Sequence, residues 1–123
     1  MPLAYAQARK MVHADDSSNG RQVELHVGET LEISLSENAS TGFRWNTPVE
    51  LPHKLEKILR PGETTVEGSG TPIGKPGVRH FYFEAIGPGM IELELYYSRP
   101  WETGKKPARK YKLRVLVRPA QER

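Results

Sequence analysis

Apolar and polar residues alternate with a period of two along most of this chain, and this alternation restricts its fold more than any other feature. Residues 22–27, 30–36, 80–86, 90–97 and 111–117 each place an apolar side chain at every second position. A β-strand sends successive side chains to opposite faces of its sheet, so the pattern predicts strands with one buried face. Turn-forming residues such as Gly, Pro and Asn separate these segments.

The number and spacing of the segments predict an all-β fold, an immunoglobulin-like antiparallel β-sandwich of about seven strands in a single domain. The 123 residues suffice for one hydrophobic core but fit two domains poorly. We expect a flexible N-terminal segment at 1–19, which could contain a first strand, the sandwich at 20–118 and a C-terminal tail at 119–123. Trp45, after the first long loop, is expected in the core.

The segment PHKLEKILR, residues 52–60, fits the alternation least well. Its leucines and isoleucine could line one face of a helix, but Pro52 and Pro61 enclose the stretch. We predict an irregular strand there.

The composition excludes several kinds of site. The chain has no cysteine, so a disulfide framework, a thiol nucleophile and a thiolate metal site are all excluded. Lys and Arg number 18 against 15 for Asp and Glu, and apart from a cluster at 105–112 they are scattered, so we expect no nucleic-acid partner. No apolar stretch is long enough to span a bilayer, so we expect no membrane insertion, and nothing points to more than a monomer.

Residues that could carry enzyme chemistry do not form a recognisable pattern. The four histidines lack metal-ligand spacing, and we expect His26 and His80 to face solvent on their strands. The glycine-rich stretch GSGTPIGKPG opens no predicted helix, so it is not a phosphate-binding motif. Ser40 and Thr41 have no acid or base nearby in sequence. We therefore expect no catalysis, metal or cofactor.

The N-terminus has two interpretations that stay open. Ala6-Gln7-Ala8 has the form of a signal-peptidase site, but the apolar stretch before it is too short for a signal peptide. The segment is either a disordered tail or the remainder of a secretory signal. The localisation is therefore unknown, with a periplasmic or secreted location weakly favoured.

Three unusual loops, at residues 37–43, 68–77 and 98–104, fall between strands that would place all three at one end of a sandwich. Loops on a rigid scaffold commonly carry binding residues. In the third loop, Pro100 stiffens the chain and Trp101 would expose a large apolar ring, although the ring could also fold back onto the sandwich edge. The loops predict a binding surface.

Three motifs in these loops resemble the signature of the chagasin family, protein inhibitors of papain-like cysteine peptidases. NASTGF (Asn38–Phe43) is similar to the family's Asn-Pro-Thr-Thr-Gly-(Tyr or Phe), and RPW (Arg99–Trp101) to its Arg-Pro-(Trp or Phe). The family's Gly-x-Gly-Gly motif has two candidates, Gly68–Thr71 and Gly74–Gly77, and the second better fits the spacing to the following aromatic strand. The resemblance extends over about residues 20–118.

The resemblance implies a reversible, tight-binding inhibitor whose three loops occlude the peptidase cleft without being cleaved. The first loop would enter the middle of the cleft with Thr41 over the catalytic cysteine and histidine. Trp101 would pack on the primed side, while the second loop would cover the other side. Ala39 replaces the family's proline in the first motif, and Pro76 stands where the second motif has glycine.

The peptidase-binding residues implied by the resemblance are Asn38, Ala39, Ser40, Thr41, Gly42, Phe43, Gly74, Lys75, Pro76, Gly77, Arg99, Pro100 and Trp101. The expected partners are papain-like cysteine peptidases. An alternative is an immunoglobulin-like binding or adhesion module that uses the same loops for a different ligand.

Overall fold

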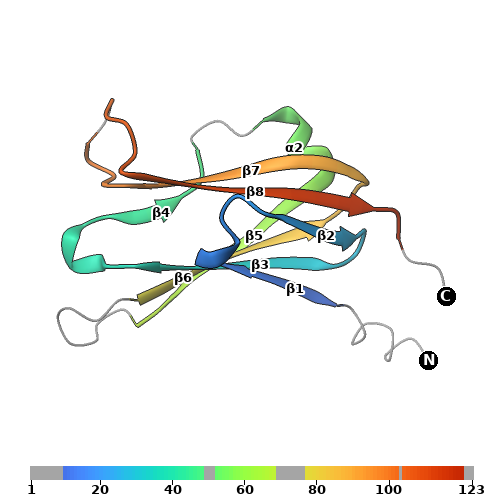
Figure 1. Cartoon of the computed structure of the whole chain (residues 1–123), viewed down its shortest axis with the longest axis horizontal. Helices are drawn as coiled ribbons and strands as arrows, with labels where there is room; N and C mark the ends of the chain where they lie inside the picture. The colour runs from blue at the N-terminus through green and yellow to red at the C-terminus, as the bar shows by residue number, and fades with distance from the viewer. Residues whose placement is uncertain (1–9, 49–51, 69–76, 103, 121–123) are drawn as a thin grey trace.

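Two four-stranded sheets pack face to face in this protein (Figure 1). The computed structural model describes residues 10–48, 52–68, 77–102 and 104–120. The strands within these ranges are β1 (Met11–Asp15), β2 (Gln22–His26), β3 (Thr30–Glu37), β4 (Arg44–Asn46), β5 (Leu59–Glu67), β6 (Gly77–Ala85), β7 (Gly89–Ser98) and β8 (Arg109–Arg118). The first sheet has the order β1-β3-β6-β5 and the second the order β2-β8-β7-β4.

The predicted sandwich is confirmed, and the described residues contribute eight strands to it instead of about seven. Four of the strand pairings are antiparallel, but β1 pairs with β3 and β2 pairs with β8 in parallel. Strand β1 lies inside the segment 1–19, and its pairing with β3 makes Met11–Asp15 an edge of the first sheet.

The prediction of an irregular strand at residues 52–60 is wrong for most of that segment. His53–Ile58 forms a short helix, α2, and β5 begins directly after it. Leu55 and Ile58, three residues apart on the helix, are both buried. Pro52 precedes the first turn and Pro61 lies in β5, so neither proline interrupts the helix. No helix in the described part of the chain is long and apolar enough to cross a membrane.

The core lies between the two sheets and is filled by the inward positions of the alternating segments. Leu31, Ile33 and Leu35 of β3 are fully buried, as the alternation predicts. Trp45 of β4 is 2% exposed, which confirms its expected place in the core. The remaining buried apolar residues are Ala14, Leu25, Leu55, Ile58, Leu59, Phe81, Phe83, Ala85, Ile91, Leu93, Leu95, Tyr111, Leu113, Val115 and Val117.

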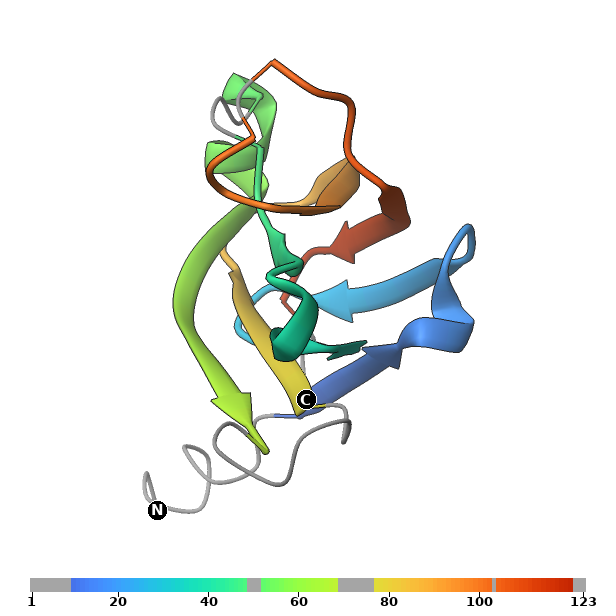
Figure 2. The same cartoon turned by 90° about the vertical axis from the view of Figure 1, so that its left-hand side faces the viewer.

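One end of the sandwich, here called the loop pole, holds the first and third loops singled out by the sequence and the strand ends that flank the second. The β3–β4 turn, the end of β5, the start of β6 and the β7–β8 connection all lie there, at the left of Figure 1. Figure 2 looks onto this end: the β3–β4 turn occupies the centre, the β7–β8 connection lies above it, and the ends of β5 and β6 lie below.

Candidate functional site

The first loop, which the structure confines to residues 38–43, is a compact turn held by its own polar groups. Asn38 Oδ1 accepts hydrogen bonds from the backbone N–H and the hydroxyl of Ser40, at 3.1 and 2.7 Å. The Thr41 hydroxyl donates to the Asn38 carbonyl oxygen at 2.8 Å and accepts from the Phe43 N–H at 3.3 Å. These bonds stabilise the 3₁₀ turn η2 (Ala39–Thr41) and leave the loop with a defined shape.

Gly42 brings the first loop into contact with the third loop, residues 99–102 and 104–108 of the β7–β8 connection. Gly42 has φ of +82°, a conformation that favours glycine. A Cβ at this position would collide with Cη2 of Trp101 and would lie 3.2 Å from its Cζ2. The indole of Trp101 therefore lies against the backbone of Gly42. Trp101 is 65% exposed, so most of this residue stays open to solvent even though its ring contacts the first loop.

Arg99 joins the two loops by a second set of contacts. Its Nε donates a hydrogen bond to the Thr41 carbonyl oxygen at 3.1 Å. Its guanidinium carbon lies 4.3 Å from the centre of the Phe43 ring, within the range of a cation–π contact. Its Nη1 lies 3.4 Å from a carboxylate oxygen of Glu102. Arg99 thus fixes the third loop to the first, and the two form one projection.

A stack of aromatic rings supports this projection from below. Phe43 stacks on Tyr97 with ring centroids 5.3 Å apart, and Tyr97 in turn contacts Trp45 at 4.9 Å. The Tyr97 hydroxyl accepts a hydrogen bond from the Asn38 N–H at 3.2 Å. Sequence reasoning missed Tyr97. Its position two residues before Arg99, at the loop end of an alternating strand, is the signal that could have identified it.

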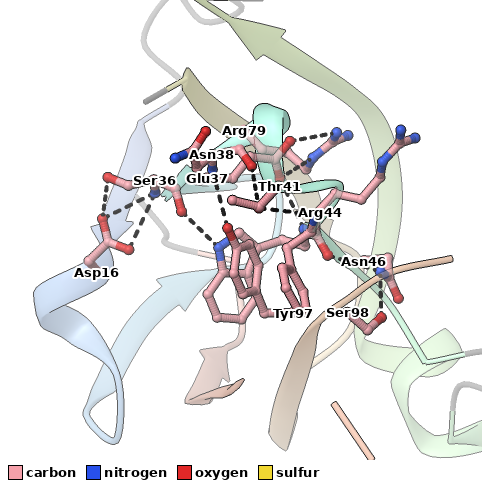
Figure 3. Close-up of polar contacts among 12 residues, drawn as sticks. Asp16, Ser36, Glu37, Asn38, Thr41, Arg44, Asn46, Arg79, Tyr97 and Ser98 are labelled. Atoms are coloured by element: carbon pink, nitrogen blue, oxygen red, sulfur yellow. Dashed lines mark hydrogen bonds and ion pairs between the residues drawn. The ribbon is translucent and has the colours of Figure 1, made fainter. Parts of the chain in front are cut away.

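Glu37 and Arg79 are two further residues that sequence reasoning missed at the loop pole. Among the described residues, Glu37 is the only polar or charged residue that is buried, at 4% exposure. Figure 3 shows its carboxylate facing the guanidinium of Arg79, close to Asn38 and Thr41 of the first loop. Strand alternation carries a signal for both, because positions 37 and 79 continue the inward-facing series of β3 and β6.

The second motif lies largely outside the described residues, which exclude Gly74, Lys75 and Pro76 and most of the alternative Gly68–Thr71. Gly77 is described and is the first residue of β6. A Cβ on Gly77 would come within 2.7 Å of the Glu67 carbonyl oxygen, so glycine allows β5 and β6 to approach closely there.

A shallow hollow of about 260 Å³ opens beside the joined loops. Its lining includes Phe43 and the cationic side chains of Arg99, Lys105 and Lys106. Glu102 also lines it and interacts with both Arg99 and Lys105, at 3.4 and 3.7 Å.

The expectation that His80 faces solvent is wrong. Its side chain is only 14% exposed, with Nδ1 2.8 Å from Ser34 Oγ and Nε2 2.6 Å from a Glu67 carboxylate oxygen. His80 lies on the outer face of the first sheet, but side chains from the flanking strands β3 and β5 cover it. Within the described ranges, no group of three or more His, Asp or Glu side chains could hold a metal ion.

Glu32 is the centre of the polar cluster around His80. Burial favours a higher pKa for its carboxyl, but hydrogen bonds from Tyr82 and His13 and the charges of His13 and His80 outweigh burial and lower the pKa. The Tyr82 hydroxyl donates to Glu32 at 2.8 Å, and His13 Nδ1 lies 2.6 Å from it. These mutual contacts connect β1, β3 and β6 across the outer face of the first sheet.

Comparison with known proteins places the chain in one family. The model of the chagasin family peptidase inhibitor I42 matches residues 24–115, well over half of the 123 residues. Amoebiasin-2 from Entamoeba histolytica is 31% identical over 99 residues, which cover 76% of this chain and 76% of that protein. Chagasin from Trypanosoma cruzi is 31% identical over 90 residues, which cover 68% of this chain and 76% of that protein.

A solved structure supports the same assignment. The crystal structure of the cysteine protease inhibitor EhICP2 from Entamoeba histolytica has a TM-score of 0.73 with this chain at 26% identity, and the match covers 88% of this chain and 96% of that one. The family match includes the first loop, the third loop and seven of the eight strands, all but β1 falling wholly or largely inside it. The chain therefore belongs to the chagasin family of peptidase inhibitors.

Proposed function

We propose that this protein inhibits papain-like cysteine peptidases reversibly by inserting its loop pole into the catalytic cleft. The joined first and third loops are the observation that carries the proposal. In the free chain, Arg99 already donates a hydrogen bond to the Thr41 carbonyl oxygen, and Trp101 already lies against Gly42. A surface that already has its binding shape loses little conformational entropy on docking, so more of the contact energy becomes affinity.

The residues of the projection have different parts in the proposed complex. Thr41 and Gly42 form the tip that enters the cleft, where glycine lets the backbone approach closely. Trp101 provides an exposed apolar ring, a type of side chain common among binding hot spots. Arg99 and Phe43 hold the projection together from within. Asn38, Ala39, Ser40 and Pro100 lie in the same two loops.

The shape of the first loop favours inhibition over cleavage. A peptidase cuts a segment that lies extended across its cleft. The 3₁₀ turn Ala39–Thr41 and the positive φ of Gly42 hold the first loop in a different shape. Straightening the loop would break the hydrogen bonds of Asn38 and Thr41 described above. We infer that the loop occupies the cleft without placing a peptide bond in position for attack.

We propose that the second motif belongs to the same surface. Gly77 begins β6 at the loop pole, and we propose that Gly74, Lys75 and Pro76, which precede it, cover the other side of the cleft. We infer a monomeric inhibitor that binds one peptidase and has no nucleic-acid or membrane partner.

The test is a titration of papain, acting on a fluorogenic peptide, with increasing amounts of the purified chain. Trypsin serves as the serine-peptidase control. We expect papain to be inhibited and trypsin unaffected, activity to return on dilution, and mass spectrometry to find the chain intact after incubation. Failure to inhibit papain or any of several cathepsin-like enzymes would contradict the proposal and favour a binding module with another ligand.

A further inference from the structure

Glu37 holds a buried ion pair at the base of the first loop. Its two carboxylate oxygens accept hydrogen bonds from Nε and Nη2 of Arg79, each at 2.9 Å. The Arg79 side chain is 18% exposed, so both partners are largely shielded from water. Two parallel bonds between a planar guanidinium and a carboxylate fix the orientation of both groups as well as their separation.

The same carboxylate also closes the stem of the first loop. Glu37 directly precedes the loop, and its Oε1 accepts a hydrogen bond at 2.9 Å from the N–H of Trp45, on the far side of the loop. A second bond crosses the stem, because the Trp45 indole N–H donates to the Ser36 carbonyl oxygen at 2.9 Å. Figure 3 shows Ser36, Glu37 and Arg79 close to Thr41 of the first loop.

These contacts tie together the two sheets and two of the binding segments. Glu37 ends β3 and Arg79 belongs to β6, both in the first sheet, whereas Trp45 belongs to β4 of the second sheet. Arg79 lies two residues after Gly77, which pairs with Glu37 in the ladder between β3 and β6. The Glu37 carboxylate thus connects the stem of the first loop with β6, the strand that follows the second motif.

The energetics of buried charges indicate what this pair contributes. Removing two charges from water costs about as much as their attraction returns, so an apolar pair of similar size is often as stable. Hydrogen bonds have direction, which apolar contacts lack, and this carboxylate makes three of them. We therefore expect the ion pair to hold the loop stem in a single geometry and to add little to the stability of the fold.

We propose that Glu37 and Arg79 are positioning residues for peptidase binding. The pair holds the two ends of the first loop in a fixed arrangement, so that Thr41 and Gly42 are presented in one conformation. Glu37 is buried beneath the loop and acts through it, without touching the peptidase itself. The inference rests on the proposed function for its effect on inhibition, but the effect on the shape of the loop can be measured in the free protein.

The test uses the double variant Glu37→Met/Arg79→Met. We expect its thermal midpoint to fall somewhat, because the buried Trp45 N–H loses its acceptor. We expect its inhibition constant for papain to rise about tenfold or more, because the loop is no longer pre-organised. In the free protein, amide hydrogen exchange at Thr41 should become faster. The Thr41 N–H bonds to the Asn38 carbonyl oxygen and makes no contact with the substituted pair, so its exchange reports on the loop itself.

The matched control is the double variant Glu24→Met/Arg118→Met. This pair has the same two-bond arrangement, at 3.2 and 3.3 Å, but its side chains are about half exposed. It joins β2 to the end of β8, at the opposite end of the sandwich from the loop pole (Figure 1). We expect neither inhibition nor Thr41 exchange to change in this control.

Each further outcome is decisive. A Glu37→Met/Arg79→Met variant that keeps wild-type inhibition and wild-type Thr41 exchange would overturn the inference. If that variant does not fold, Arg79→Lys replaces it, since Lys keeps the charge but cannot hold both carboxylate oxygens in one plane. Arg79→Lys should show faster Thr41 exchange and weaker inhibition, and unchanged values would again overturn the inference. If the wild type does not inhibit any peptidase, the proposed function fails, and Thr41 exchange alone decides whether the pair shapes the loop.

Discussion

Two glycines in this fold share a backbone conformation but have different surroundings. Gly42 has φ of +82° and Gly20 has φ of +83°, so both occupy the region that other residues seldom adopt. Apart from the two neighbouring residues, no heavy atom of the described part of the chain lies within 4 Å of a Cβ built on Gly20, whereas a Cβ on Gly42 would collide with the Trp101 ring. At the scale of single residues, substitutions at Gly20 and Gly42 can therefore be compared. Both would strain the backbone, but only the one at Gly42 would also move the third loop.

Gly42→Ala is therefore expected to lower both stability and inhibition. The positive φ alone should cost about 1–2 kcal/mol of unfolding free energy, and Gly20→Ala should show this cost as well. Only Gly42→Ala should also displace Trp101 and raise the inhibition constant for papain. Urea unfolding and the papain titration measure the two effects, and equal inhibition by the two variants would contradict the contact between the loops.

Trp101→Ala should weaken papain binding with little effect on stability. The ring is 65% exposed, so its removal takes little apolar surface out of the folded core. As an anchor of the interface it should contribute on the order of 2 kcal/mol or more to binding, which is roughly 30-fold in the inhibition constant. Met90→Ala provides the control, because Met90 is also exposed, at 39%, but lies at the start of β7, away from the loop pole. An unchanged inhibition constant for Trp101→Ala would remove this residue from the interface.

At the scale of elements, strand alternation predicts most of the sandwich and part of the site. The series Leu31, Ile33 and Leu35 identifies β3 and its buried face. The same series makes position 37 inward-facing, so a glutamate there already indicates a buried charge in need of a partner. The partner could not be predicted from Glu37 alone, because Arg79 reaches it only through the register between β3 and β6.

Two elements could not be predicted from alternation for physical reasons. Strand β5 has only its first residue, Leu59, buried and runs along an exposed edge of the first sheet, so it needs no apolar alternation. Helix α2 is only six residues long, which is too short for a clear helical period. The contacts by which Arg99 and Trp101 join the third loop to the first could likewise not be predicted, because the residues in contact are far apart in the sequence.

Tyr111 shows how one side chain connects elements of different sheets. It lies in β8, is 1% exposed, and donates a hydrogen bond from its hydroxyl to the Asp15 carbonyl oxygen at the end of β1, at 3.0 Å. Burial raises the pKa of Tyr111 to about 12. Because the folded state binds this proton more tightly than the unfolded state, its contribution to stability is complete below about pH 10 and is lost as the pH rises through 12.

Tyr111→Phe should consequently lower stability at pH 7 by about 1 kcal/mol, the usual effect of one lost hydrogen bond. Above pH 10 the wild type should lose stability more steeply than the variant, because only the wild type must keep this phenol neutral. Urea unfolding at pH 7 and at several pH values above 9 gives both results. Parallel pH profiles for the two proteins would show that Tyr111 does not titrate as described.

At the scale of the whole molecule, the two sheets form a rigid base for a projection made by two loops. The core is continuous between the sheets, and at the loop pole the Glu37 carboxylate joins both of them. Partners with pre-organised surfaces usually change their backbone little on binding. We therefore propose that the loop pole is a preformed wedge, which keeps substrate away from the peptidase for as long as the wedge stays in the cleft.

The most direct test of this wedge is the dependence of papain inhibition on substrate concentration. Occlusion of the cleft makes substrate and inhibitor mutually exclusive, so the apparent inhibition constant should rise linearly with substrate concentration. The maximal rate at saturating substrate should be unchanged. An apparent inhibition constant that does not depend on substrate would mean that the chain binds away from the cleft, and it would contradict the central claim.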